Sequence, residues 1–225
     1  MMEEKIKVEK KKITKERKIE RELLYILGFG VFLIILFFAA NSYFKSLNTF
    51  EYQGLTFTKT KTGNIPLYYY SYYFNAPPSN KLYHYNLYLK VDPRENNATV
   101  AGDKIIFDRG KTVYITINST GLQECENSVI AVADLSRFIA DNQLQVKGGN
   151  PDFWEAGNKK QEWVTCENKQ GKEVIEIMEG DETKIDINSN CHKITVNNCE
   201  TLQATEKFIL QSIIDAKESD DVKLR

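Results

Sequence analysis

The stretch Leu23–Ala40 (LLYILGFGVFLIILFFAA) constrains this chain most, because its eighteen residues contain no charged side chain and no proline. As a helix rising about 1.5 Å per residue it spans roughly 27 Å, close to the ~30 Å hydrocarbon core of a bilayer. Only a helix satisfies all of its own backbone polar groups within lipid. The sequence therefore predicts one transmembrane helix, with its interfacial residues, over residues 23–44.

Charge on either side of this segment predicts its orientation. Residues 1–22 form a charged tail with nine basic and six acidic side chains, whereas the basic side chains of residues 41–60 are only Lys45 and Lys59. Lys and Arg near a membrane helix favour the cytoplasmic side. We therefore expect a single-pass protein of the cell membrane with a cytoplasmic N-terminus and an uncleaved signal anchor. A cleavable signal peptide, cut near the small residues Ala40 and Ser42, is the competing interpretation.

The four cysteines agree with export, because Cys125, Cys166, Cys191 and Cys199 all lie beyond the membrane segment. An even number of thiols in an exported domain indicates two disulfides. Three pairings are open, and the shortest loops favour Cys191 with Cys199 and Cys125 with Cys166. The gaps of 41, 25 and 8 residues lack the close ligand pairs of a zinc site. We expect neither a metal nor a cofactor.

Two further features concern the exported part. Asn97 and Asn118 begin sequons and are candidate glycosylation sites, although Asn and Thr are frequent enough for both to arise by chance. Beyond the tail, 21 basic and 25 acidic residues leave a slight negative charge. That balance argues against nucleic acid as a partner, since nucleic acid requires a clustered basic surface.

The first part of the exported chain has the pattern of strands. Residues 45–49 suggest a short stalk, and residues 50–216 are long enough for one domain with its own core. Period-two alternation between Phe50 and Ile117 predicts an antiparallel meander. Its strands are expected near residues 55–60, 67–74, 82–91, 104–108 and 112–117.

The period then changes. Residues 128–141 predict a helix whose apolar face holds Val129, Val132, Leu135, Phe138 and Ile139. After an irregular segment up to residue 160, we expect strands at 173–178, 184–187 and 193–196, a helix at 201–216 and a polar tail at 217–225. Strands followed by a mixture of strands and helices indicate the α+β class, here a meander with two packed helices.

Tyrosines crowd the predicted hairpin of residues 67–91. Because a strand alternates faces, they cannot all enter one core. The pattern favours cross-strand aromatic pairing beneath a covering helix, which would make these rings structural. The alternative is an outward binding surface for a protein or a glycan, formed by Tyr69, Tyr73, His84 and Tyr88.

Catalytic motifs give no comparable signal. The sequence lacks a phosphate loop, H-E-x-x-H, G-x-S-x-G and the EF-hand pattern. His192 lies beside Cys191, but a Cys–His hydrolase needs a free thiol, which paired cysteines do not offer. Several carboxylates could serve as paired acids, without a spacing that selects two of them: Asp152, Glu155, Glu162, Glu176, Asp181 and Glu182.

The phrases LYLKVDPR and CHKITVNNCETLQATEKF, with one membrane segment ahead of one domain, resemble uncharacterised single-pass membrane proteins of archaea. The resemblance implies an archaeal cell envelope and brings no activity and no residue roles.

The sequence as a whole favours a non-catalytic, membrane-anchored binding or accessory domain with an envelope protein or glycan as partner. The alternative is an anchored hydrolase acting on envelope polymers. A sensor relaying a signal inward is disfavoured, because the short tail has no room for a signalling domain.

Overall fold

The computed structural model describes residues 2–76, 81–108, 111–118, 122 and 124–223. The chain divides into two compact units, Met1–Phe50 and Glu51–Arg225. The first unit is essentially one helix, α1 (Met2–Asn48), which continues through the charged tail and through most of the expected stalk. Within α1, Leu23–Asn48 is the one stretch of the described residues long and apolar enough to cross a membrane. The expected apolar helix is confirmed.

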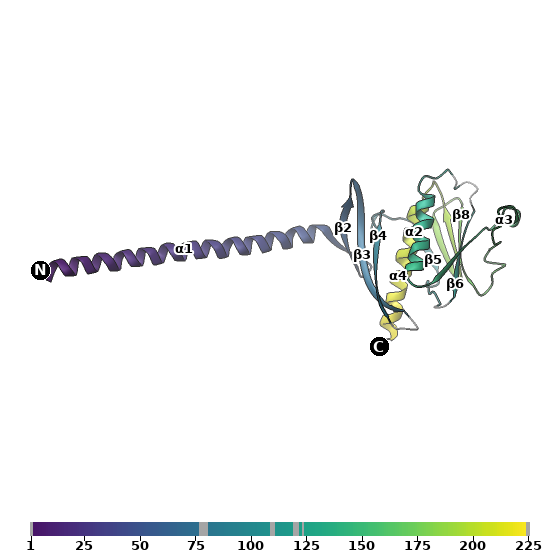
Figure 1. The fold of residues 1–225 in the computed structure, drawn as a ribbon. Helices are drawn as coiled ribbons and strands as arrows, with labels where there is room; N and C mark the ends of the chain where they lie inside the picture. The colour runs from purple at the N-terminus through teal and green to yellow at the C-terminus, as the bar shows by residue number, and fades with distance from the viewer. Residues whose placement is uncertain (1, 77–80, 109–110, 119–121, 123, 224–225) are drawn as a thin grey trace. The chain divides into compact units, whose positions relative to one another are not determined.

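The second unit belongs to the α+β class, as predicted, and has three layers (Figure 1). The first layer is an antiparallel sheet of β1 (Thr49–Tyr52), β2 (Leu55–Thr62), β3 (Ile65–Ala76) and β4 (Lys81–Leu89), in that order. The middle layer holds the helices α2 (Ser128–Asp141) and α4 (Thr201–Lys223). The third layer is a six-stranded mixed sheet.

The six-stranded sheet has the order β5-β9-β10-β8-β6-β7. Four neighbouring strands, β10, β8, β6 and β7, are parallel, and β9 and β5 run in the opposite direction. The bounds of its strands are β5 (Thr99–Gly102), β6 (Thr112–Ile117), β7 (Gln145–Gly149), β8 (Glu173–Glu179), β9 (Lys184–Asn188) and β10 (Cys191–Val196). The expected meander therefore ends at β4, because β6 pairs with parallel strands from much later in the chain.

The position of α4 in the middle layer explains why this helix is buried on nearly every side. Phe208, Ile209, Leu210 and Ile213 are all less than a tenth exposed. A helix with one sheet on either side has little solvent-facing surface, so it departs from the single apolar stripe of a surface helix. In α2 the buried residues are Ser128, Ala131, Leu135, Phe138 and Ile139. Val129, expected on the apolar face, is instead 80% exposed.

Three other expectations are wrong. The helix expected to end at residue 216 continues as α4 to Lys223, so it includes most of the expected polar tail. Residues 104–108 are not a strand: the backbone N–H of Ile105 donates a 2.8 Å hydrogen bond to Asp215 of α4, so this segment attaches to a helix side chain. The segment before residue 160 is not irregular, because β7 lies at the sheet edge and α3 (Phe153–Lys159) follows it. Residues 77–80, between two of the expected strands, and residues 109–110, between two others, lie outside the described residues.

Candidate binding surfaces

The register of the β3–β4 hairpin divides its tyrosines between two faces. Tyr69 lies opposite Tyr88, and Tyr73 lies opposite His84. Their ring centroids are 5.1 Å and 4.4 Å apart, and the Tyr73–His84 pair is stacked. These four side chains, which we call the tyrosine face, lie on the side of the sheet turned away from the helices. Tyr73 is 65% exposed and Tyr88 is 50% exposed.

The other tyrosines of the hairpin pack inward. The rings of Tyr72 and Tyr85 lie 5.4 Å apart, and Tyr85 makes an edge contact with Phe138 of α2 at 5.8 Å. The Tyr72 hydroxyl donates to the side-chain oxygen of Asn142 at 2.5 Å. Burial, with Asp141 and Asp134 nearby, raises the pKa of Tyr85 to about 12. Cross-strand packing beneath a helix thus explains the rings of Tyr72 and Tyr85. It does not explain the side chains of the tyrosine face, which take no part in this packing.

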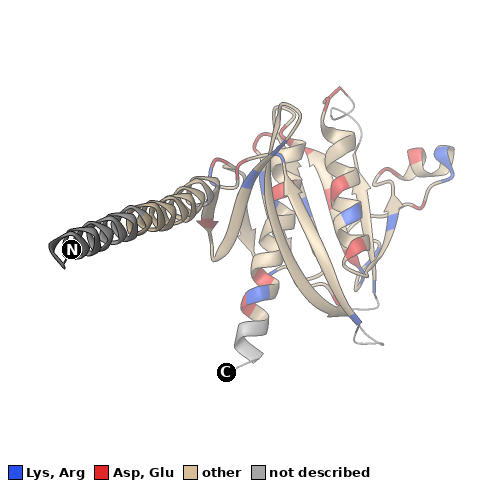
Figure 2. Ribbon diagram, turned by 60° about the vertical axis from the view of Figure 1, so that its left-hand side comes forward, with Lys and Arg blue, Asp and Glu red and all other residues tan. Residues whose placement is uncertain are grey.

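The tyrosine face is held in place by its own contacts. The Tyr69 hydroxyl donates a 2.8 Å hydrogen bond to the Asn86 side-chain oxygen across the hairpin. Aromatic side chains ordered before binding lose little entropy when a ligand arrives. The face carries no formal charge, because strands β3 and β4 have none between Ile65 and Ala76 or between Leu82 and Leu89 (Figure 2).

A second group of exposed aromatic side chains lies around α3. It was not predicted from the sequence. Phe153, Trp154 and Trp163, which we call the tryptophan cluster, are 57%, 77% and 42% exposed. The ring of Phe153 contacts both tryptophans edge-on, at 5.5 Å and 5.2 Å. The signal in the sequence was that both tryptophans of the chain lie nine residues apart beside a Gly-Gly-Asn-Pro segment.

The side chain of a buried asparagine forms hydrogen bonds with the backbone and side chains near the tryptophan cluster. Asn150 is 6% exposed and donates from its amide to Gln161 and Glu155, while its side-chain oxygen accepts from the N–H of Asp152. The Asp152 carboxylate then caps α3 by accepting from the N–H of Glu155 at 2.8 Å. These bonds order the backbone under the exposed rings.

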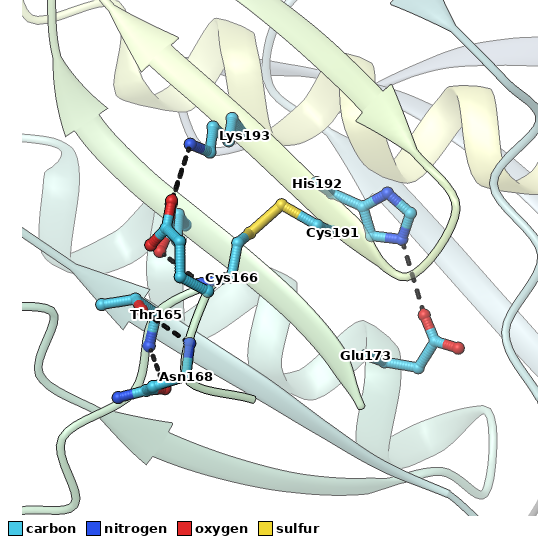
Figure 3. Close-up of a disulfide and its surroundings, with 9 residues drawn as sticks. Thr165, Cys166, Asn168, Glu173, Cys191, His192 and Lys193 are labelled. Carbon is cyan, nitrogen blue, oxygen red and sulfur yellow. Dashed lines mark hydrogen bonds and ion pairs between the residues drawn. A yellow bond between two sulfur atoms is a disulfide. The ribbon is translucent and has the colours of Figure 1, made fainter. Parts of the chain in front are cut away.

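Both disulfides form, but with pairings other than the favoured ones. Cys125 pairs with Cys199, and Cys166 pairs with Cys191. Loop length alone was a poor guide, because the fold brings the start of α2 next to the start of α4, where Ser128 and Thr201 also share a buried 2.8 Å hydrogen bond. The Cys166–Cys191 bond attaches the segment after the tryptophan cluster to the first residue of β10 (Figure 3).

The neighbouring residues Cys191 and His192 point to opposite faces of β10, as the alternation of a strand requires. The disulfide lies on one side, while His192 is fully buried on the other and its Nε2 lies 3.7 Å from a carboxylate oxygen of Glu173 (Figure 3). Phe107 and Phe208 lie against the imidazole. No free cysteine remains. The geometry therefore separates the two groups that a Cys–His nucleophile requires.

Five of the six carboxylates considered as paired acids are engaged locally, with Asp152 and Glu155 close together at the start of α3. Glu155 bonds Lys159 of α3, and Glu162 bonds Lys169; in both cases the lysine holds the pKa of the carboxyl below its ordinary value. Glu176 is buried and accepts from the N–H of Cys166 at 2.8 Å. Glu182 lies 3.3 Å from Lys184, and Asp181 offers its backbone oxygen to Asn197.

The two sequon asparagines are both exposed. Asn97 precedes β5, whose first residue is Thr99. Asn118 follows β6, and the rest of its sequon lies outside the described residues. Among those residues, no group of three His, Cys, Asp or Glu side chains is arranged to hold a metal ion.

Comparison with family models, with curated proteins and with solved structures finds no match for this chain.

Proposed function

We propose that this protein is a membrane-anchored binding domain of the cell envelope, and that the tyrosine face is its contact surface. The observation that carries the proposal is the division of the hairpin: Tyr72 and Tyr85 are used in packing, while Tyr73, His84 and Tyr88 remain exposed and ordered. Surface-exposed aromatic rings in a continuous group are characteristic of interaction sites.

The absence of formal charge on this surface supports a particular kind of ligand. Phenol hydroxyls, an imidazole and the side chain of Asn86 offer hydrogen bonds, and the rings offer apolar contact. An uncharged partner surface or a neutral glycan matches that chemistry better than an anionic polymer does. The domain is placed outside the cell membrane in this proposal, with the N-terminus in the cytoplasm. The bias of Lys and Arg toward residues 1–22 and the two disulfides support this orientation.

The contact surface is tested with the double variant Tyr73→Ser/Tyr88→Ser of the full chain, expressed in the producing cell. After chemical cross-linking, we expect the amount of envelope material that co-purifies with the variant to be at least ten-fold lower than the amount that co-purifies with the wild type. Thermal unfolding should stay nearly unchanged, because both rings are exposed. The matched control is Trp154→Ser, which removes a still more exposed ring elsewhere and should leave co-purification intact. Equal recovery with all three chains contradicts the proposal.

The orientation is tested by adding protease to intact cells that express the chain with an epitope at each end. The C-terminal epitope should disappear while the N-terminal epitope persists. The opposite pattern overturns the placement outside the membrane.

A further inference from the structure

Strand β4 forms an edge of the four-stranded sheet, since no strand of the described chain pairs with its other side. Its register with β3 runs without a bulge from Lys81 to Leu89. Natural edges are normally protected by shortness, charge, proline, a bulge or a covering element. β4 has nine residues, no proline and no formal charge between Lys81 and Lys90. Shortness, proline and a bulge are therefore missing, and the charge within β4 is confined to its first residue, Lys81.

The open edge has a defined end. The backbone N–H groups of Lys90 and Val91 donate to the carboxylate of Glu206 on α4, at 2.8 Å and 2.9 Å. The Lys90 ammonium binds Asp134 of α2. Beyond Leu89 the backbone is thus satisfied within the domain, and the pairing edge is confined to β4 itself.

There is room beside this edge. A cleft of about 370 Å³ is lined by Tyr83, His84, Tyr85, Asn86, Asp141 and Gln143. Successive strand residues point to opposite faces, so a cleft against one face would meet only alternate residues. A cleft lined by four consecutive residues therefore lies beside the edge of β4. The backbone N–H and C=O groups that can pair with another strand point toward that edge. Another strand, about 4.8 Å away, would occupy that position.

We propose that β4 pairs antiparallel with β4 of a second copy of this chain, joining two four-stranded sheets into one of eight strands. The strand complements itself when the two-fold axis passes through Tyr85. His84 then lies opposite Asn86 of the second copy, and Leu82 lies opposite Tyr88 of the second copy. Lys81 lies opposite Leu89 of the second copy, so the register brings no like charges together. Cross-strand pairs of this kind stabilise antiparallel sheets.

Anchoring makes this small interface effective. One added strand pair buries less than the roughly 1,200 Å² of a typical stable complex. Two chains held in one bilayer by Leu23–Asn48 meet at a much higher effective concentration than free domains do. The dimer should therefore form in membranes and dissociate on dilution in detergent. Because an antiparallel edge keeps both sheets facing the same way, the two tyrosine faces become one continuous surface.

The full-length chain, fluorescently labelled and reconstituted in vesicles at low density, tests the dimer by counting photobleaching steps. We expect two steps for the wild type and one step for His84→Lys/Asn86→Lys, because the register sets these lysines against one another. The control Thr58→Lys/Thr60→Lys places the same charges on the same sheet face, but on β2 away from the edge, and should keep two steps. A one-step wild type, or equal behaviour of both variants, overturns the proposal.

The register is tested by oxidative cross-linking. Vesicles containing a mixture of His84→Cys chains and Asn86→Cys chains should form cross-linked dimers several-fold faster than either chain alone, because only the mixed pair is directly opposed. A mixture of Thr58→Cys and Thr60→Cys chains is the control and should not cross-link. Equal rates for the mixture and the single variants overturn the register centred on Tyr85. The assay needs no ligand, so its outcome is independent of the binding function proposed above.

Discussion

The carboxylate of Glu206 accepts the backbone N–H of Lys90 at 2.8 Å, and so connects the central helix α4 to the end of the edge strand β4. Its second oxygen accepts the N–H of Val91 at 2.9 Å. Burial raises the pKa of Glu206 to about 7, against the opposing effect of these two hydrogen bonds and of Lys90. Glu206 is 3% exposed, so its carboxyl lies in the interior of the domain, between two layers.

The first prediction concerns pH. Because the pKa of Glu206 is higher in the folded chain than its ordinary value of 4.5, the folded state binds the proton more tightly. This contribution to stability is complete below about pH 4.5 and is lost as pH rises through 7, by about 3 kcal/mol in total. Denaturant unfolding between pH 5 and 8 should show this fall, and Glu206→Gln should flatten it. Glu218→Gln, at an exposed ion pair, should keep the slope; an unchanged slope in Glu206→Gln contradicts the assignment.

The second prediction separates the disulfides. Their sequence separations are 74 and 25 residues, and longer closed loops restrict the unfolded chain more. Chain entropy gives about 4.5 kcal/mol for Cys125–Cys199 and about 3.5 kcal/mol for Cys166–Cys191. Removing the first pair as Cys125→Ala/Cys199→Ala should therefore lower the unfolding midpoint more than Cys166→Ala/Cys191→Ala. Non-reducing peptide mapping of the wild type checks the pairing itself, and a 191–199 peptide would contradict it.

The third prediction uses two adjacent glycines of β7. A Cβ at Gly149 would lie 2.6 Å from a methyl carbon of Val164, whereas a Cβ at Gly148 would meet nothing within 4 Å. Gly149→Ala should cost about 1–3 kcal/mol through overpacking. Gly148→Ala, one residue away, should be close to neutral. Both are measured by denaturant unfolding followed through the tryptophan cluster, and equal costs would show that the approach of Val164 is not the cause.

The fourth prediction concerns the buried pair of Glu173 and His192. Removing one member leaves the other polar group in an apolar interior, so Glu173→Leu and His192→Phe should each cost about 3–5 kcal/mol. The double variant should cost clearly less than the sum, because no unmatched group remains. A double-mutant cycle by chemical unfolding measures this coupling, and strict additivity would contradict a direct interaction across the 3.7 Å separation.

These elements also show what the sequence could predict. The strong periodicity of residues 128–141 predicted α2 with its observed bounds, and the alternation of the hairpin placed Tyr73 and His84 on the outer side. Local patterns could not predict contacts made by distant parts of the chain. Residues 104–108 have the composition of a strand but attach to Asp215, some 110 residues later.

The same limit explains the remaining errors. β7 (QVKGG) has little strand signal of its own and exists because it pairs with β6. Val129 has the helical spacing of a core residue, yet it lies in the first turn of α2 and is 80% exposed. The disulfide partners were set by the approach of α2 and α4, which no loop length reveals.

The nested disulfides have a mechanical consequence. Cys166–Cys191 lies inside the loop closed by Cys125–Cys199, which contains α2, α3 and four strands of the six-stranded sheet. Tension applied between the N-terminal helix and the C-terminus crosses that loop through one covalent sulfur–sulfur bond. The roughly 70 residues inside it, about 250 Å of extended chain, cannot be drawn out while the bond is intact. Under tension, chain can be drawn out only from the elements outside that loop, which are α1, the four-stranded sheet, β5, β6 and α4.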